Sequence, residues 1–329
     1  MNQRSLVPTM GVMPSVDEIR AARQMLNPYL PVTRLCPAPS LTKLLGAAVH
    51  LKLESDLPTG SFKPRGAMYA LASRLQREAV REVVASSTGN HGAAVAYAAS
   101  VFGVSATIFL PEGANPIKRA RIAELGARIV DVEEREDRDA AQAARAHAMR
   151  TQGYFLHDAT DPVLPAGPAT IACEIFEQAP DTEAVVVPVG DTALIRGVAA
   201  AVRWLRPETR IIGVQAAKAP SYYLSWQEAR VVTTASCDTI ADGLATRIPE
   251  SANVEAIRSH VDEMVLVTED QMLAAMRHLL LEEHVVAEAS GAAAAAAAIA
   301  GNWRGLQTTL LVTGANVSPE VLARVAAAT

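Results

Sequence analysis

The segment LKLESDLPTGSFKPRGA, residues 51–67, places Lys63 beside Phe62, between two glycines and just after an extended run. A lysine in such a loop is ordinarily a solvated surface residue. The alternative is a lysine that forms an imine with an aldehyde, which requires an amine whose ammonium form is disfavoured by burial or by a neighbouring cation. Phe62 offers an apolar neighbour and Arg65 a nearby cation. The segment alone leaves both interpretations open.

The rest of the chain alternates short β-branched runs with longer alanine-rich stretches of helical period. The runs are VHLKLE, VVAS, ATIFLP, ARIVDV, AVVVPV, RIIGVQ, EMVLV and TLLVTG. Such alternation is typical of parallel sheets covered by helices, so we predict an α/β fold with parallel-rich, twisted sheets. Residues 291–300, GAAAAAAAIA, are predicted to form a closely packed helix instead of a low-complexity segment, because alanine is the best helix former.

Glycine and proline clusters near residues 57–60 and 154–168 suggest that a smaller domain is inserted into a larger one. We therefore predict a large domain made of residues 1–55 and 158–329. Residues 56–157 would form a small, mobile domain.

Composition limits the possible partners. The chain has 329 residues, 30 of them basic and 35 acidic, for a net charge of −5 without a basic block. This balance disfavours nucleic acid and anionic membranes and favours a small substrate.

The three cysteines are far apart and odd in number, which argues against a disulfide framework and a zinc site. The sequence contains no apolar leader and no long apolar run, so we expect a cytoplasmic protein.

In two more segments, a predicted strand is followed by a loop of small polar residues and then by the start of a helix. In ASSTGNHG, residues 85–92, backbone N–H groups and the hydroxyls of Ser86, Ser87 and Thr88 could bind a carboxylate, although the same residues are ordinary N-caps. The sequence does not decide between a carboxylate-binding loop and an ordinary helix N-cap. In VVVPVGDTALIRG, residues 185–197, the loop amides could bind a phosphate. The loop matches neither G-x-G-x-x-G nor a G-K-[ST] ending, so a nicotinamide or nucleoside triphosphate site is poorly supported.

An imine-forming lysine, a carboxylate loop and a phosphate loop make a specific combination. With it, the sequence resembles the pyridoxal-phosphate enzymes of the tryptophan synthase β-subunit fold (fold type II), and among them the threonine/serine dehydratases and serine racemases. The resemblance extends over about residues 41–316. It is carried by LKLESDLPTGSFKPRGA, SSTGNHGAAVAYAA, VVVPVGDTALIRGVA, DTIADGLA, VAEASGAAAAA and LLVTGAN.

The resemblance implies that pyridoxal 5'-phosphate is the cofactor, and that Lys63 binds its aldehyde and moves the proton at Cα. Thr88 stands where racemases carry a serine that protonates the opposite face, and is the second implied catalytic residue. Thr313 would lie beside the pyridine nitrogen, where a neutral hydroxyl favours β-elimination over transamination. The implied cofactor-binding residues are Phe62, Lys63, Asn90, Gly190, Asp191, Thr192, Ala193, Leu194, Gly243, Glu288 and Thr313.

The substrate carboxylate would be bound by the loop of the small domain. Its implied residues are Ser87, Thr88, Asn90 and His91. Asn90 would also hydrogen-bond the phenolic oxygen of the cofactor. Glu288 has two interpretations, an acid stabilised at a helix N-terminus or a group beside the cofactor ring that relays protons.

The implied reaction removes water from a β-hydroxy amino acid such as threonine or serine and releases a 2-oxo acid and ammonia. Two alternatives stay open: an amino-acid racemase or β-replacement enzyme of the same fold, and a cofactor-binding protein without turnover.

Enzymes of this fold are usually dimers, so the resemblance implies a homodimer. The chain ends soon after LLVTGAN, so we expect a catabolic or specialised member without the regulatory domain of feedback-controlled dehydratases. The identity of the substrate side chain stays open.

Two departures from the family pattern stand out. The phosphate loop is usually rich in glycine, whereas here it contains Asp191 and Thr192. A carboxylate about 4 Å from a phosphate would cost several kcal/mol, so we expect Asp191 to point away, capping the helix or meeting Arg196, while Thr192 adds a hydroxyl donor.

The second departure concerns a divalent cation. Racemase-like members hold one through a Glu and an Asp after the strand that corresponds to RIIGVQ. This chain has Gln215, Ala219 and Ser221 there. Hard cations prefer carboxylate oxygen, so we predict no magnesium or calcium at this position.

Overall fold

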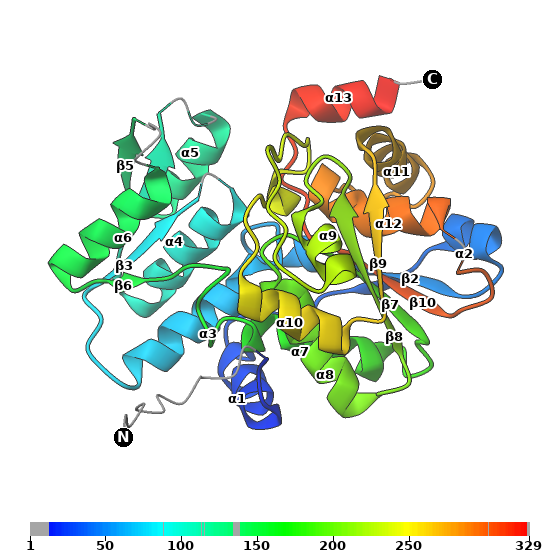
Figure 1. The fold of residues 1–329 in the computed structure, drawn as a ribbon, viewed down its shortest axis with the longest axis horizontal. Helices are drawn as coiled ribbons and strands as arrows, with labels where there is room; N and C mark the ends of the chain where they lie inside the picture. The colour runs from blue at the N-terminus through cyan, green and yellow to red at the C-terminus, as the bar shows by residue number, and fades with distance from the viewer. Residues whose placement is uncertain are drawn as a thin grey trace.

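The computed structural model describes residues 13–87, 89–112, 114, 116–133, 139–301 and 303–327. Two sheets organise this part of the chain, the larger on the right of Figure 1 and the smaller on the left. The predicted α/β class with parallel-rich sheets is confirmed.

The larger sheet has six strands in the order β1-β2-β10-β7-β8-β9, parallel except for the β1–β2 pair. The strands are β1 (Leu35–Pro37), β2 (Val49–Leu53), β7 (Ala184–Pro188), β8 (Arg210–Ala216), β9 (Glu263–Val267) and β10 (Thr308–Val312). Helices cover both faces. Ala184 and Val186 of β7 pack toward α11 and α12, whereas Val185 and Val187 pack toward α7 and α8. This double burial explains why the strand sequences are continuous apolar runs.

The smaller sheet has four parallel strands in the order β5-β4-β3-β6. They are β3 (Glu82–Ser86), β4 (Ser105–Pro111), β5 (Arg128–Val132) and β6 (Tyr154–Phe155). These strands fall inside the range 56–157 expected for the small domain, and those of the larger sheet fall outside it. The exact domain limits and the mobility of the small domain stay predictions.

Helices connect the strands as the alternating sequence pattern predicts. They are α1 (Val16–Leu26), α2 (Pro39–Leu45), α3 (Lys63–Leu75), α4 (Asn90–Phe102), α5 (Pro116–Glu124), α6 (Ala140–Thr151), α7 (Ala166–Gln178), α8 (Ala193–Leu205), α9 (Ser221–Glu228), α10 (Ser251–His260), α11 (Glu269–Leu281), α12 (Ala289–Ala300) and α13 (Pro319–Ala327), with 3-10 turns η1 (Glu54–Asp56) and η2 (Asp242–Leu244).

The alanine-rich segment is a helix, as predicted. Residues 289–298 of α12 are all buried, and the helix packs on β10, β7 and α11. Small side chains allow this close approach: a Cβ on Gly291 would lie 2.3 Å from the carbonyl oxygen of Gly314. Gly291 thus lets the start of α12 lie close to Gly314 after β10, where the site described below is built.

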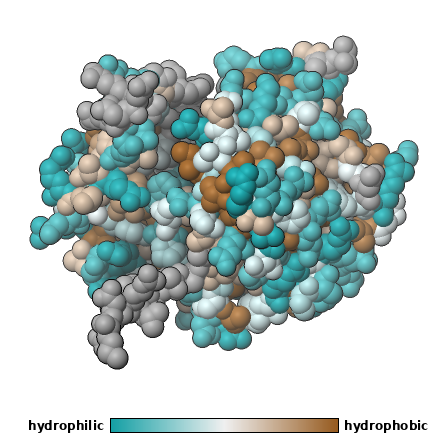
Figure 2. Space-filling model, viewed as in Figure 1, coloured by the Kyte–Doolittle hydropathy of each residue, from teal (hydrophilic) through white to brown (hydrophobic). Residues whose placement is uncertain are grey.

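The visible surface is mostly polar, with apolar residues gathered near the centre of the view in Figure 2. Loops between α9 and α10 cross this region in Figure 1, and they contain the exposed Ile240 and Ile248. None of the helices in the described ranges is both long enough and apolar enough to cross a membrane.

Candidate active site

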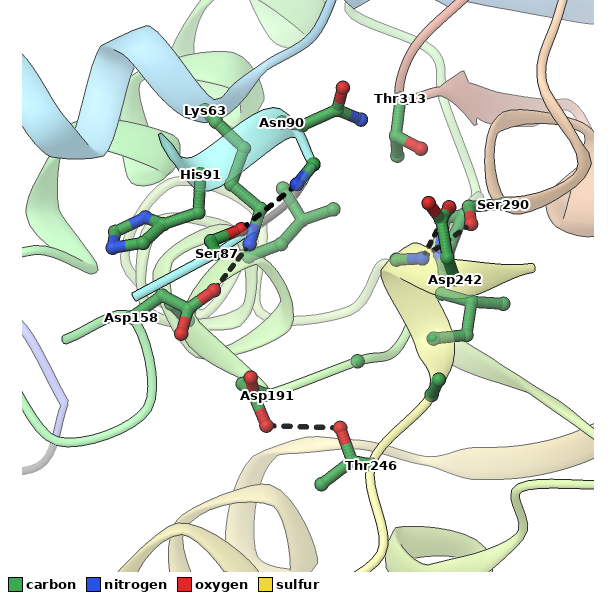
Figure 3. Close-up of a pocket in the computed structure, with 18 of the residues that line it drawn as sticks. Lys63, Ser87, Asn90, His91, Asp158, Asp191, Asp242, Thr246, Ser290 and Thr313 are labelled. Carbon is green, nitrogen blue, oxygen red and sulfur yellow. Dashed lines mark hydrogen bonds and ion pairs between the residues drawn. The ribbon is translucent and has the colours of Figure 1, made fainter. Parts of the chain in front are cut away.

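A pocket lies at the carboxyl ends of strands from both sheets (Figure 3). Loops after β3, β6, β7 and β10 and the first residues of α3, α4, α8 and α12 line it, and it encloses about 270 Å³. Ligands of α/β proteins bind beyond the carboxyl ends of parallel strands. Every site residue predicted from the sequence lines this pocket, except Thr88, which lies outside the described residues. The structure therefore brings the predicted residues together.

Lys63 is the first residue of α3, and the segment before it is fixed to the end of β10. The Phe62 N–H donates to the carbonyl of Thr313 at 3.0 Å, and Ser61 forms a bridge with Gly314. Lys63 thus lines the pocket at a helix start. The interpretation of Lys63 as a solvated loop residue is wrong.

The charge environment of Lys63 differs from the sequence-based expectation. Its Nζ lies 2.7 Å from Oδ2 of Asp158, in the loop after β6. Burial by itself would lower the pKa of Lys63, but the Asp158 carboxylate raises it above its ordinary value. Lys63 is therefore an ammonium ion paired with Asp158, a residue that sequence reasoning missed.

Arg65 is not the neighbouring cation that we expected, because its guanidinium is buried in a separate ion network. It donates from Nε to Glu54 at 2.8 Å and from Nη1 to Glu174 at 2.6 Å. Lys52 also donates to Glu174, at 2.6 Å. The network joins α3 to β2, η1 and α7. Arg65 thus anchors the helix that begins with Lys63 instead of disfavouring its ammonium form.

The predicted carboxylate loop leads directly into α4, which begins at Asn90. The N-cap of this helix is Gly89, which has no side chain to satisfy the N–H groups of the first turn. Ser87 lines the pocket and accepts a hydrogen bond from the Gly89 N–H at 3.2 Å. The uncapped N–H groups are compatible with an anion site, and since glycine is also a common N-cap residue, the carboxylate site stays a prediction.

His91 lies in the pocket wall but its imidazole is already engaged. Nε2 donates to the carbonyl of Leu156 at 3.0 Å, and burial lowers the pKa of His91, so the ring is neutral. In Figure 3 the ring points away from Lys63. His91 therefore does not offer Nε2 to a substrate carboxylate, although its backbone belongs to the first turn of α4.

Asn90 links the starts of α4 and α12. Its Nδ2 donates to Oε1 of Glu288 at 2.7 Å, and its Oδ1 accepts from Asn316 at 2.6 Å. Glu288 is the N-cap residue of α12, is 7% exposed and lines the pocket. Both interpretations of Glu288 are compatible with this position. Sequence reasoning missed Asn316 as a partner of Asn90.

The predicted phosphate loop, residues 190–194, connects β7 to α8. The first N–H groups of a helix have no partner within it, and they face the loop where a phosphate is expected. Gly190 is packed against the backbone of Gly243, whose N–H donates to Oγ of Ser290 at 3.0 Å. Ser290, which sequence reasoning missed, and Thr313 lie across the pocket from Lys63 in Figure 3.

Gly190→Ala should weaken the attachment of a phosphate-bearing ligand and destabilise the chain. A Cβ at this position would lie 2.2 Å from the carbonyl oxygen of Gly243, so one of two backbone segments must move. We expect a loss of about 1–3 kcal/mol in the free energy of unfolding, measured by urea denaturation. Gly46→Ala is a control without a clash, because no atom lies within 4 Å of that added Cβ; its φ of +71° adds a left-handed strain that Gly190 does not have. An unchanged ligand affinity in Gly190→Ala would contradict this account of the loop.

Asp191 and Thr192 depart from our expectation. Asp191 lines the pocket, and its Oδ1 accepts a hydrogen bond from Thr246 at 2.9 Å, so it does not cap α8. The Thr192 hydroxyl donates to the Asp191 carbonyl at 2.6 Å and accepts from Nε of Arg196 at 3.1 Å. Its proton is therefore not available to a ligand. Thr192 also has a φ of +69°, a left-handed conformation that favours glycine.

Gln215, a neutral amide, stands where racemase-like members of the family hold a divalent cation. Oε1 of Gln215 accepts from the Tyr223 N–H at 2.9 Å, and its Nε2 is buried with no partner in the described chain. An amide N–H cannot ligate a hard cation. No cluster of three or more His, Cys, Asp or Glu suited to a metal occurs within the described ranges. The expectation of no magnesium or calcium at this place stays a prediction.

A lysine amine in a pocket between two helix starts, at the carboxyl ends of parallel strands, defines an enzyme that can hold a phosphorylated aldehyde. The chain belongs to the pyridoxal-phosphate dependent enzyme family, whose model matches residues 26–314. It is 36% identical over 314 residues to an L-threonine ammonia-lyase of Thermotoga maritima, covering 95% of this chain and 78% of that protein. These findings confirm the resemblance seen in the sequence.

Two solved structures extend the comparison. A threonine deaminase of T.th. superposes with a TM-score of 0.86 at 34% identity, covering 93% of this chain and 99% of that one. Maize serine racemase gives a TM-score of 0.89 at 27% identity, covering 95% and 96%. Pyridoxal phosphate is thus the cofactor of this chain, as predicted.

The residues present fit this cofactor. Gly190 lets the loop pack closely against the backbone of Gly243, and the first turn of α8, which has no side-chain cap, offers N–H donors for a phosphate. Lys63 provides the amine and Thr313 a hydroxyl on the other side of the same pocket. The carboxylate of Asp191 does not fit this account of the loop, because it would repel a phosphate.

Proposed function

We propose that this chain is a pyridoxal-phosphate-dependent lyase that removes water from a β-hydroxy amino acid of the threonine or serine type, yielding a 2-oxo acid and ammonia. The observation that carries the proposal is the position of Lys63, which lines one pocket together with the start of α4 and the loop 190–194. The similarity to an L-threonine ammonia-lyase and to a threonine deaminase supports the reaction type.

Each residue of the site would have a separate role. When bound, the cofactor supplies an electron sink for negative charge at Cα. Lys63 would hold its aldehyde, the N–H groups of 190–194 its phosphate, Asn90 its ring oxygen and Thr313 its ring nitrogen. A neutral hydroxyl such as that of Thr313 does not supply a full proton, which favours elimination over transamination.

Lys63 would also move the Cα proton. Asp158, 2.7 Å from Nζ, orients the amine within the pocket. The N–H groups at the start of α4 and the hydroxyl of Ser87 would bind the substrate carboxylate and set the direction of the Cα–H bond. Thr88, outside the described residues, would be the second catalytic group.

A product assay tests this function. Purified protein supplied with pyridoxal phosphate should release ammonia and a 2-oxo acid in equal amounts from at least one β-hydroxy amino acid. Racemisation is the second candidate, supported by the similarity to maize serine racemase. Accumulation of the D-isomer without ammonia would favour the racemase, and bound cofactor with neither product would favour a binding protein without turnover.

We also propose that the chain works as a homodimer in the cytoplasm. The unpaired state of Cys36, Cys173 and Cys237 supports a reducing compartment. Light scattering of the purified protein measures the oligomeric state.

A further inference from the structure

Two aspartates of the pocket wall, Asp158 and Asp191, form a hydrogen-bonded pair although they come from different loops. Asp158 follows β6, Asp191 precedes α8, and their side chains share a hydrogen bond. Ionised carboxylates are acceptors only, so a hydrogen bond between two of them requires one proton. The pair therefore contains one carboxylate and one carboxylic acid.

The proton of this pair belongs to Asp191. Burial alone would raise the pKa of Asp158, but the charge of Lys63, whose Nζ lies 2.7 Å away, lowers it well below its ordinary value, with smaller contributions from His91 and His157. Burial and then the Asp158 charge raise the pKa of Asp191 to about 7. Asp158 is thus the carboxylate and Asp191 the acid.

Three helices place further titratable groups around Asp191. Lys63 of α3 favours its ionised form, and Arg196 of α8 lies within its field. Tyr222 of α9 is neutral, because burial raises its pKa above the ordinary value. A phosphate bound in the loop would add a negative charge and disfavour ionisation of Asp191. A loaded pocket would therefore keep the proton in the pair, and a protonated Asp191 does not repel the phosphate as a carboxylate would.

Lys63, Asp158 and Asp191 form a hydrogen-bonded chain along one side of the pocket (Figure 3). At its far end, Oδ1 of Asp191 accepts from the Thr246 hydroxyl at 2.9 Å, which leaves Oδ2 to carry the proton. A chain of this kind can move a proton from an amine to an acid that faces a reacting group. Hydroxide is a poor leaving group, so the removal of water from a β-hydroxy amino acid requires such an acid.

We propose that Asp191 is the general acid that protonates the departing β-hydroxyl, and that Asp158 returns a proton to it from Lys63. The inference rests on the proposed function and adds a catalytic residue to it. Lys63 takes the Cα proton, and the electron pair of the Cα–H bond forms the Cα=Cβ double bond. The Cβ–O bond breaks as Asp191 gives its proton to the oxygen, which leaves as water. The proton on Lys63 then passes through Asp158 to Asp191, which restores both groups.

Substrates with different leaving groups test the proposal. Serine and β-chloroalanine differ only in the leaving group, as do threonine and 2-amino-3-chlorobutyrate, and chloride departs without a proton. Asp191→Asn keeps the shape but lacks the acid. At saturating cofactor it should lower kcat for the hydroxy substrate on the order of 10²-fold or more and change kcat for its chloro partner by no more than about threefold. Equal losses for both substrates would overturn the proposal.

Two variants are matched controls for this ratio of rates. Asp242→Asn makes the same change across the pocket from Asp191 in Figure 3, and Asp181→Asn makes it at an exposed position. Both should keep the wild-type ratio of kcat between hydroxy and chloro substrates. A selective loss for the hydroxy substrate in Asp242→Asn, with none in Asp191→Asn, would place the acid on the other side of the pocket and overturn the assignment.

The pH dependence of the same ratio is a second readout. An acid acts only while it is protonated, so the rate with the hydroxy substrate relative to the chloro substrate should fall as pH rises through the pKa of Asp191. In Asp191→Asn this fall should be absent. A ratio that is independent of pH in the wild type, with Asp191→Asn no different, would contradict a role of Asp191 as acid.

Infrared spectroscopy measures the protonated state without turnover. A carboxylic acid has a C=O band separate from that of a carboxylate. The protein with bound cofactor should show this band near neutral pH, and Asp191→Asn should lose it while Asp181→Asn keeps it. An identical band in Asp191→Asn and wild type would overturn this inference alone. A protein that binds cofactor but releases ammonia from neither substrate would overturn the proposed function.

Discussion

Lys63→Ala should abolish covalent attachment of pyridoxal phosphate and lower kcat/KM on the order of 10³-fold. Lys63 provides the only amine among the described residues that line the pocket. Removing it leaves the phosphate loop and Thr313 in place, so the cofactor would bind without a covalent bond. Reduction with borohydride followed by mass spectrometry measures the attachment independently of activity.

Two further variants give this prediction its controls. Lys63→Arg keeps a positive charge beside Asp158, but a guanidinium stays protonated and cannot act as the amine nucleophile. It should therefore preserve the fold and still lose the adduct. Lys218→Ala removes an exposed lysine that does not line the pocket, and this variant should keep the covalent cofactor adduct. A reduced cofactor adduct found on Lys63→Ala protein would show that another amine does this work.

Much of the fold could be predicted because it depends on local patterns. The strands and the alanine helix α12 follow from residue type and period. The position of Lys63 was predictable for the same reason: a strand followed by a glycine loop and a helix start places side chains at the carboxyl edge of a sheet. The loops 85–92 and 190–194 obey the same rule.

The partners of these residues could not be predicted because they come from distant loops. Asp158 lies 95 residues from Lys63 in sequence, and Thr246 lies 55 from Asp191. No local pattern marks either contact. Arg65 was misjudged because nearness in sequence was taken for nearness of charge, whereas successive helix residues point in different directions.

The ion network under α3 should matter more to stability than any exposed ion pair. Glu174 is 6% exposed and accepts from both Arg65 and Lys52. Glu174→Ala leaves two buried cations with Glu54 as their remaining carboxylate. Removing one partner of a buried pair costs about 3–5 kcal/mol. We expect a loss of this size in the free energy of unfolding, measured by urea denaturation.

The matched control is Glu78→Ala, which removes the partner of Arg74 in an exposed pair where both side chains are about half accessible. That change should cost no more than about 0.5 kcal/mol. Glu174→Gln, which keeps the shape and a hydrogen-bond acceptor, should lie between the two. Equal losses in Glu174→Ala and Glu78→Ala would mean that the network contributes little.

The pH dependence of this contribution follows from the same charges. Burial alone would raise the pKa of Glu174, but Arg65 and then Lys52 together lower it below its ordinary value. A carboxylate with a lowered folded-state pKa stabilises the fold fully above its unfolded pKa of about 4.3, and this contribution is lost as pH falls through the folded value. The stability difference between wild type and Glu174→Gln should therefore be constant near neutral pH and shrink in acid. Because the network fixes the helix that begins at Lys63, the same acid range should also loosen the geometry of the amine in the pocket.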